Sequence, residues 1–175
     1  MIIGEPYKFA FWVDIVPTWN EDNSTWINGI FSLCIKGKIY PCIDTSTLNS
    51  DLPALLQAWH SYSMPCNNES LFHASMTDAL KHLLEITYPT IGEGNYKYKL
   101  STQTIEDNDV YSFIVADKNE VRILVATMPN NNGPLEIDET KIDEVIIAKS
   151  EVCSMVSELD SYYQRIINNK RLNLP

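Results

Sequence analysis

The sequence lacks any apolar run long enough to cross a membrane, because a membrane helix needs about 18 apolar residues and the longest apolar stretches here have strand length. It also has no basic segment followed by an apolar core near its start, so we expect no secretory signal and a protein that stays in the cytoplasm. Its four cysteines form no CxxC pair and no metal-finger spacing. We therefore expect free thiols, mostly buried, rather than disulfides or zinc ligands.

Basic side chains are scarce as well. Thirteen lysines and arginines stand against 23 acidic residues, which leaves a formal net charge of −10. The excess is uneven, because residues 101–160 carry 13 acidic and 4 basic side chains. Such a chain repels phosphate, which disfavours binding to nucleic acid or to an anionic membrane, and it attracts a basic protein partner. Solubility alone is the other explanation for this charge.

Known catalytic motifs are absent too. The sequence contains no nucleophile elbow, no glycine loop that cradles phosphate and no dinucleotide fingerprint. Cys66, His73 and His82 lie within 17 residues, but their spacing matches no zinc-binding pattern. We therefore expect no catalytic residue, no cofactor and no metal. A small hydrolase-like enzyme that uses Cys66, His73 and His82 remains the alternative from another class.

The residues that are present predict one globular domain over residues 1–175, since 45% of them are apolar and no repeat or long linker divides the chain. Segments rich in β-branched and aromatic residues predict strands at residues 7–16, 29–36, 38–43, 96–102, 110–116, 121–127 and 142–148. Apolar residues at helical spacing predict three helices, capped at their amino ends by Asp51, Ser75 and Ser150. The third is the longest.

Strands and helices are largely segregated along the chain, which is typical of an α+β fold. We predict a mainly antiparallel sheet of about six strands, with three helices packed on it and a long C-terminal helix.

Two features are candidates for binding a partner. The first is a cluster of five acids within nine residues, comprising Glu136, Asp138, Glu139, Asp143 and Glu144. The second is the pair Trp19 and Trp26, which flank a polar loop and could anchor an interface. Trp12 and Trp59 are expected in the core. The plain alternative for the acids is a solvated loop.

The N-terminal third resembles a known family. Its opening Ile3-Gly4-x-Pro6-Tyr7-Lys8-Phe9-Ala10 is followed by Trp19-Asn20-Glu21, Asn28-Gly29-Ile30-Phe31, Ile35-x-Gly37-x-x-Tyr40-Pro41 and Thr47-Leu48-x-x-Asp51-Leu52. Together these are similar to an immunity protein family of bacterial polymorphic toxin systems, including contact-dependent growth inhibition. The resemblance is most specific over residues 1–52 and is looser beyond them.

The resemblance implies a cytoplasmic protein that binds the C-terminal toxin domain of a cognate effector and blocks it. It brings no catalytic residue with it. Because many such toxins are basic nucleases, an acidic inhibitor that occludes the active site sterically and electrostatically fits both the resemblance and the charge. A scaffolding subunit without a toxin partner is a further alternative.

Overall fold

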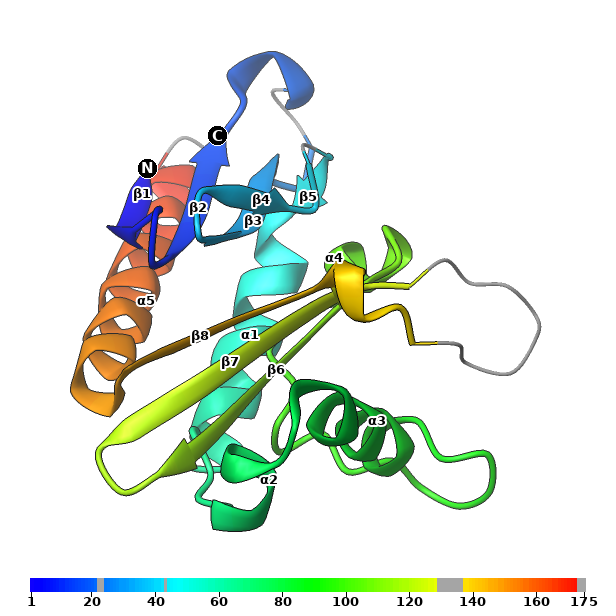
Figure 1. The fold of residues 1–175 in the computed structure, drawn as a ribbon. Helices are drawn as coiled ribbons and strands as arrows, with labels where there is room; N and C mark the ends of the chain where they lie inside the picture. Colours follow the sequence, from blue (N-terminus) through cyan, green and yellow to red (C-terminus); the bar gives the residue numbers. More distant parts are fainter. Residues whose placement is uncertain (22–23, 43, 129–136, 173–175) are drawn as a thin grey trace.

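A computed structural model of the chain describes residues 1–21, 24–42, 44–128 and 137–172 (Figure 1). Its strands form two antiparallel sheets. The first, sheet A, has the order β1-β2-β3-β4, with the short strand β5 paired to β3. Its strands are β1 (Ile2–Glu5), β2 (Phe9–Ile15), β3 (Asn28–Ile35), β4 (Lys38–Tyr40) and β5 (Ser46–Thr47).

The turn between β3 and β4 is a tight hairpin, as the sequence predicts. Lys36 and Gly37 both have positive φ, 50° and 80°, which matches the right-handed twist of the two strands that they join. This turn determines the register, in which Cys34 lies opposite Ile39.

Sheet B has three strands in the order β6-β7-β8. They are β6 (Val110–Asp117), β7 (Glu120–Thr127) and β8 (Ile142–Ala148). The strand β7 is central and almost fully buried, as its run of apolar residues predicts. The last strand leads directly into the C-terminal helix α5 (Lys149–Leu172), the longest of the molecule.

Four further helices and two 3-10 turns complete the described structure. They are α1 (Leu48–Ser61), α2 (Glu69–His73), α3 (Met76–Thr87), α4 (Gln103–Asp107), η1 (Pro17–Trp19) and η2 (Glu139–Lys141). Ser75 caps α3 as predicted, because its hydroxyl accepts a hydrogen bond from the Asp78 backbone N–H at 3.1 Å.

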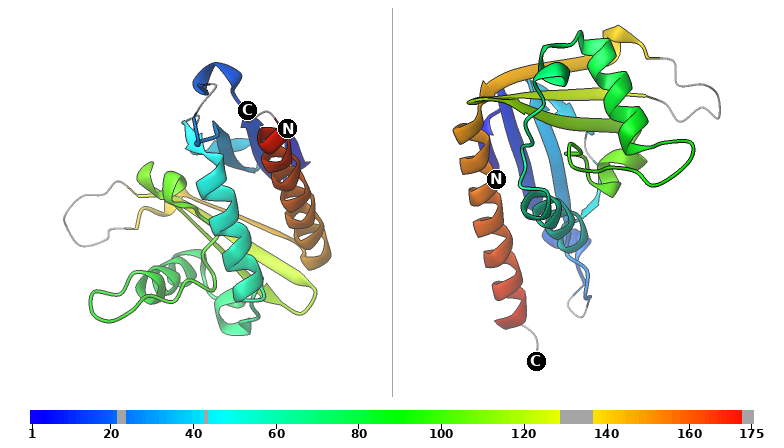
Figure 2. Two further views of the ribbon diagram at one scale, coloured as in Figure 1. Left: turned by 180° about the vertical axis from the view of Figure 1, so that it is seen from behind. Right: turned by 90° about the horizontal axis from the view of Figure 1, so that it is seen from below.

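Two hydrophobic cores lie on opposite faces of sheet B. One lies between this sheet, the helices α1 and α5, and the face of sheet A that carries Phe11. It includes Phe11, Leu52 and Ile123. The other joins α2 and α3 to the opposite face through residues such as Leu83 and Phe113. In Figure 2, α1 and α5 lie together on one side of the molecule and α3 lies on the other.

The predicted α+β class, the antiparallel strands and the long final helix are confirmed. The strands divide between two sheets, and the short helices α2 and α4 add to the three that were predicted. The strand predicted at residues 96–102 is wrong, since there the chain makes only an isolated bridge between Lys99 and Phe113 before α4 begins.

Two predicted caps are also wrong. The first helix begins at Leu48 after Thr47, so Asp51 lies in its first turn. The Asp51 carboxylate is buried there and accepts a hydrogen bond from the Thr104 hydroxyl at 2.7 Å, which ties α1 to α4. The last helix begins at Lys149, one residue before Ser150. Within the described residues, no helix is long and apolar enough to span a membrane.

Candidate partner-binding surface

The acidic cluster of the sequence is spread over η2 and the start of β8. Glu136 lies outside the described residues. Asp138 is exposed and caps η2, because its Oδ1 accepts hydrogen bonds from the Thr140 backbone N–H (3.0 Å) and hydroxyl (2.7 Å). These bonds from Thr140 hold the pKa of Asp138 below its ordinary value. Glu139 is also exposed and accepts a hydrogen bond from the Thr77 hydroxyl at 2.7 Å. Both carboxylates therefore lie at the surface.

Asp143 has a different environment. Its carboxylate forms an ion pair with the Lys38 ammonium at 2.8 Å and accepts a short hydrogen bond from the Tyr40 hydroxyl. Burial opposes ionisation of Asp143, but these two donors outweigh it and the pKa lies below its ordinary value. Burial and the hydrogen bond to Asp143 raise the pKa of Tyr40 in turn. Asp143 thus links β8 of sheet B to β4 of sheet A.

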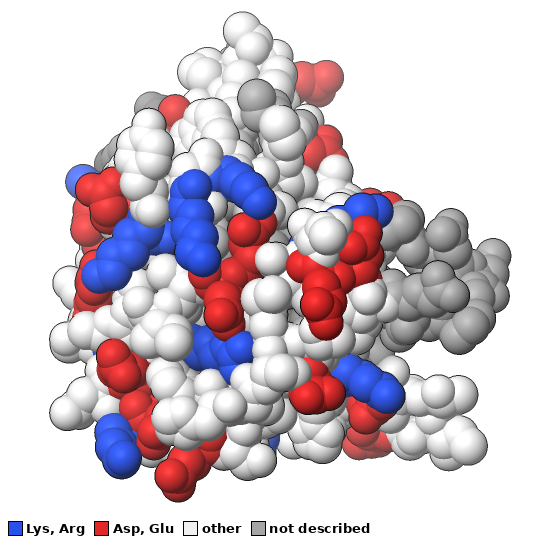
Figure 3. All heavy atoms as spheres, in the orientation of Figure 1, with Lys and Arg blue, Asp and Glu red and all other residues white. Residues whose placement is uncertain are grey.

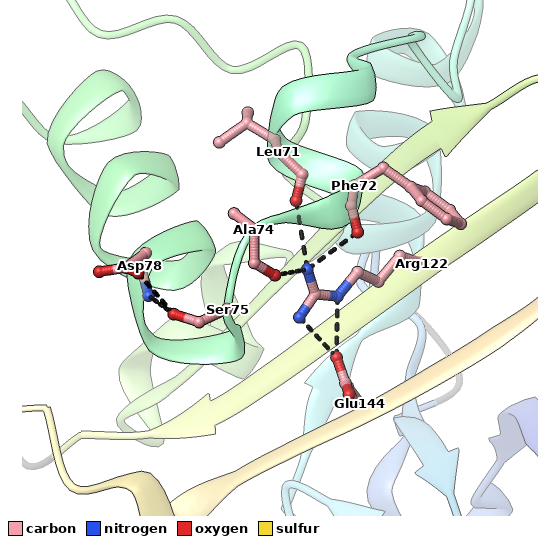
Figure 4. A network of polar contacts seen from close by, with 7 residues as sticks. All are labelled: Leu71, Phe72, Ala74, Ser75, Asp78, Arg122 and Glu144. Carbon is pink, nitrogen blue, oxygen red and sulfur yellow. Dashed lines mark hydrogen bonds and ion pairs between the residues drawn. The ribbon is translucent and has the colours of Figure 1, made fainter.

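Glu144 is part of a buried network around Arg122 of β7 (Figure 4). Its Oε2 accepts hydrogen bonds from Arg122 Nε at 2.8 Å and Nη2 at 2.7 Å. The other end of the guanidinium, Nη1, donates to the backbone carbonyls of Leu71, Phe72 and Ala74 at 3.2, 3.1 and 2.8 Å. Arg122 is only 4% exposed, so this network ties α2 to two strands of sheet B.

The structure therefore divides the predicted cluster into two pairs. Asp143 and Glu144 form ion pairs with Lys38 and Arg122, whereas Asp138 and Glu139 make only hydrogen bonds among the described residues, to Thr140 and Thr77. Figure 3 shows acidic groups interleaved with basic ones over this face, rather than one continuous acidic patch.

The predicted aromatic anchors lie at one end of sheet A. Trp19 ends η1 and is 39% exposed, and Trp26, just before β3, is 58% exposed. Trp59 lies in the core, as expected. Trp12 was also expected in the core, but it is half-buried and belongs to neither core cluster. It lies on β2, opposite Ser32 of β3, on the face of sheet A that points away from the core.

Two hollows flank α4. One, of about 460 Å³, separates α1 from the segment before α4 and is lined by residues that include Tyr62, Tyr96, Lys99 and Thr102. The other, of about 400 Å³, is lined by Leu84, Tyr88, Gln103, Glu106, Asp107, Asp109 and Tyr111. The tyrosines of the two hollows, Tyr62, Tyr88, Tyr96 and Tyr111, were not predicted as candidate site residues from the sequence.

Glu106 lines the second hollow and has three polar partners. Its carboxylate pairs with the Lys99 ammonium at 2.7 Å and accepts hydrogen bonds from the hydroxyls of Tyr88 (2.6 Å) and Ser101 (2.7 Å). Burial and the bond to Glu106 raise the pKa of Tyr88. Glu106 is therefore an internal acceptor, which stabilises the fold around α4.

The residues of the enzyme alternative do not come together. The Cys66 thiol donates a hydrogen bond to the Tyr62 carbonyl at 3.2 Å, and His73 pairs with Asp117 at 3.0 Å. His82 lies exposed on α3. In the described part of the chain, no group of three or more metal-ligating side chains could hold an ion.

Comparison with known families identifies the class of protein. The sequence model of the family described as immunity protein 42 (Imm42) matches residues 1–162. The chain belongs to the immunity protein 42 family. It is therefore an immunity protein, and its partner is a cognate toxin. No curated protein matches its sequence.

A solved structure shares the fold of this immunity protein. The crystal structure of CdiI from Burkholderia dolosa AUO158 superposes with a TM-score of 0.74 and is 23% identical in sequence. The match covers 93% of this chain and 99% of that chain. The same arrangement of sheets and helices thus exists in another protein at low sequence identity.

Sequence reasoning missed Arg122, a buried residue of this immunity protein with several hydrogen-bond partners. Arg122 is a single base within the apolar stretch of β7, and that position was its only signal. A charged residue in a strand buried on both faces must be paired, so an acid on a neighbouring strand could have been sought. The partners proved to be Glu144 and three backbone carbonyls, and the carbonyls leave no trace in a sequence.

Proposed function

We propose that this immunity protein acts in the cytoplasm, where it binds the C-terminal toxin domain of a cognate effector and blocks its active site without catalysing a reaction. The observation that carries the proposal is the family match over residues 1–162. The free thiols of Cys34, Cys42, Cys66 and Cys153 suit a reducing compartment.

The charge of the chain supports a basic toxin, and a nuclease in particular. A nuclease offers a positively charged groove to the phosphates of its substrate, and a protein of net charge −10 is attracted to the same groove. Occlusion of that groove by carboxylates and by the bulk of the inhibitor would exclude the nucleic acid. Steering of this kind raises the association rate and weakens as salt is added.

Within the acidic cluster, Asp138 and Glu139 are the carboxylates that we place against the toxin, together with the neighbouring Glu136. Their charge is exposed and no lysine or arginine pairs with it among the described residues. Asp143 and Glu144 contribute to the field of this region, but internal ion pairs already neutralise much of their charge. Trp19 and Trp26 would add apolar contact area.

The first experiment is copurification with the toxin domain encoded beside this gene, at low salt and at about 0.5 M salt. We expect a one-to-one complex whose association slows at the higher salt, and protection of cells that express the toxin. A variant in which Cys66, His73 and His82 are all alanine should protect equally well. Failure of the wild-type protein to bind would refute the proposed function, and loss of protection in the triple variant would revive the enzyme alternative.

A second experiment locates the steering charges. The double variant Asp138→Lys/Glu139→Lys changes the net charge as much as the control Glu85→Lys/Glu158→Lys, which reverses two exposed acids on α3 and α5. We expect the first to slow association about tenfold at low salt and the control to slow it far less, because charge near the contact dominates steering. Equal rates for the two variants would show that this cluster does not face the toxin.

A further inference from the structure

Sheet A has two largely apolar faces, and among the described residues only one of them packs into a core cluster. On β2 and β3, the side chains of Phe9, Phe11, Phe31 and Leu33 point into the core with α1 and α5. Because side chains alternate along a strand, the residues between them lie on the opposite face. We name this the outer face of sheet A, and it comprises Ile2, Ala10, Trp12, Asp14, Ile30, Ser32, Cys34 and Ile39.

The outer face is apolar where water would favour polar residues. An antiparallel sheet with one face in solvent normally alternates apolar and polar positions. Here the small residues Ala10, Ser32 and Cys34 are buried between larger side chains, so the accessible part of the face is formed by Ile2, Trp12, Ile30 and Ile39. Ile2 is 51% exposed, the other three are half-buried, and none of the four belongs to either core cluster. In Figures 1 and 2, α1, α5 and sheet B lie on the other side of sheet A, and the segment that contains η1 extends past the end of its strands.

The tryptophans extend this apolar surface at one end. Strand β3 starts two residues after Trp26, and η1, which ends in Trp19, packs against β3. Three of the four tryptophans of the chain therefore lie on or beside the outer face. Contiguous apolar surface of this kind marks an interaction site, and tryptophan is the residue most enriched where binding energy concentrates.

The acidic residues on and near the outer face indicate what kind of partner would bind there. Between Lys8 and Lys36 the chain has no lysine or arginine, but it has Asp14, Glu21 and Asp22. Asp14 lies on the outer face opposite Ile30, where it is exposed and pairs at 3.6 Å with the N-terminal ammonium, and Glu21 is exposed near the tryptophans. A second copy docked on this face by a two-fold axis would bring these acids against their own copies, whereas a basic partner would bring cations to them.

We propose that the outer face of sheet A is the surface on which the cognate toxin domain docks, with Trp12 and Trp26 as its apolar anchors. The inference rests on the proposed function, because it names the surface through which the immunity protein holds its toxin. The toxin is expected to offer an apolar patch bordered by lysine and arginine. Acids around the tryptophan end orient it, and desolvated aromatic contact slows its release.

The test compares Ile2→Lys with the matched control Ile146→Lys. Both isoleucines lie on edge strands and are similarly exposed, at 51% and 48%, but Ile146 lies on β8 of sheet B. Both variants add one positive charge, so a difference between them reports position alone. Trp26→Ala is the second variant, at a side chain that is 58% exposed. Binding of the adjacent-gene toxin domain is measured by titration calorimetry, with thermal melting to confirm folding.

We expect Ile2→Lys and Trp26→Ala each to weaken toxin binding about thirtyfold, the ratio that corresponds to about 2 kcal/mol, and Ile146→Lys less than threefold. If all three bind as tightly as the wild type, the outer face is not the docking surface, although the immunity function stands. If the wild type itself fails to bind, both proposals fall. If Ile2→Lys converts a dimer to a monomer without changing toxin affinity, the face joins two copies of this chain and the inference is wrong.

Discussion

The replacement of Arg122 by methionine tests whether the Arg122–Glu144 network is structural. Methionine fills a similar volume without polar atoms, so the variant leaves Glu144 and the carbonyls of Leu71, Phe72 and Ala74 without their donor. Removing one partner of a buried ion pair costs about 3–5 kcal/mol. The Glu144 side chain is one-third exposed and can be rehydrated, which places the expected loss near the lower limit, at about 3 kcal/mol.

Glu144→Gln is the milder change at the same site. The amide oxygen can still accept from Arg122, whose guanidinium also keeps its three carbonyl partners, so we expect a loss of about 1 kcal/mol. Because both changes act on one interaction, the double variant should lose less than the sum of the two single losses.

The assay is urea denaturation at pH 7, with the midpoint and slope fitted for each variant. A loss below about 1 kcal/mol for Arg122→Met would refute the structural reading of this network. Toxin affinity of Glu144→Gln, measured where the variant is fully folded, gives the complementary result. If stability were unchanged and affinity fell tenfold, Glu144 would belong to the toxin interface instead.

Two further predictions concern the carboxylates of Asp143, which is half-buried, and Asp51, which is buried. The pKa of Asp143 is lowered below its model-compound value of 3.8, so its ion pair with Lys38 stabilises the fold above that pH and loses this effect as the pH falls through the lower, folded-state pKa. Asp143→Asn should therefore cost about 1 kcal/mol at pH 7 and progressively less as the pH falls below about 3.8, and a loss that did not change with pH in urea denaturation would contradict this. Asp51→Ala should cost about 1–2 kcal/mol by leaving the Thr104 hydroxyl unpaired, whereas Thr104→Val in the same background should add little.

Local signals in the sequence predicted local structure well. Ser75 followed by Asp78 is a cap that a short stretch of chain forms by itself, and it is present. The turn around Lys118 and the strands on either side of it are likewise set by neighbouring residues. Where the structure depends on a distant residue, prediction failed. Asp51 is not a cap, because its carboxylate bonds to Thr104, 53 positions further along the chain.

The division of the strands between two sheets has the same origin. Each strand has apolar residues that would pack in either sheet, and no local pattern tells which strands will pair. The prediction that Trp12 is buried failed for a related reason. Large aromatic residues usually lie inside, but its position on β2 places it on the face that no core covers.

Density of acids along the sequence is a poor guide to the field that a partner meets. Asp143 and Glu144 belong to the densest acidic stretch, yet their cations lie 105 and 22 residues away and are brought close only by folding. An acid that is paired inside the protein contributes to stability, whereas an exposed acid such as Asp138 contributes to attraction at a distance.

This division predicts three classes of substitution, which change the stability, the association rate or the dissociation rate. Changes at Asp143 or Glu144 should lower stability with little effect on binding, because their charges act within the fold. Changes at Asp138 should lower the association rate and its salt dependence, since rim charges act before contact is made. Changes at Trp12 or Trp26 should raise the dissociation rate, because buried anchors act only once the complex has formed. A substitution at Trp26 that slowed association and left dissociation unchanged would contradict this assignment of steering to carboxylates and of retention to the outer face of sheet A.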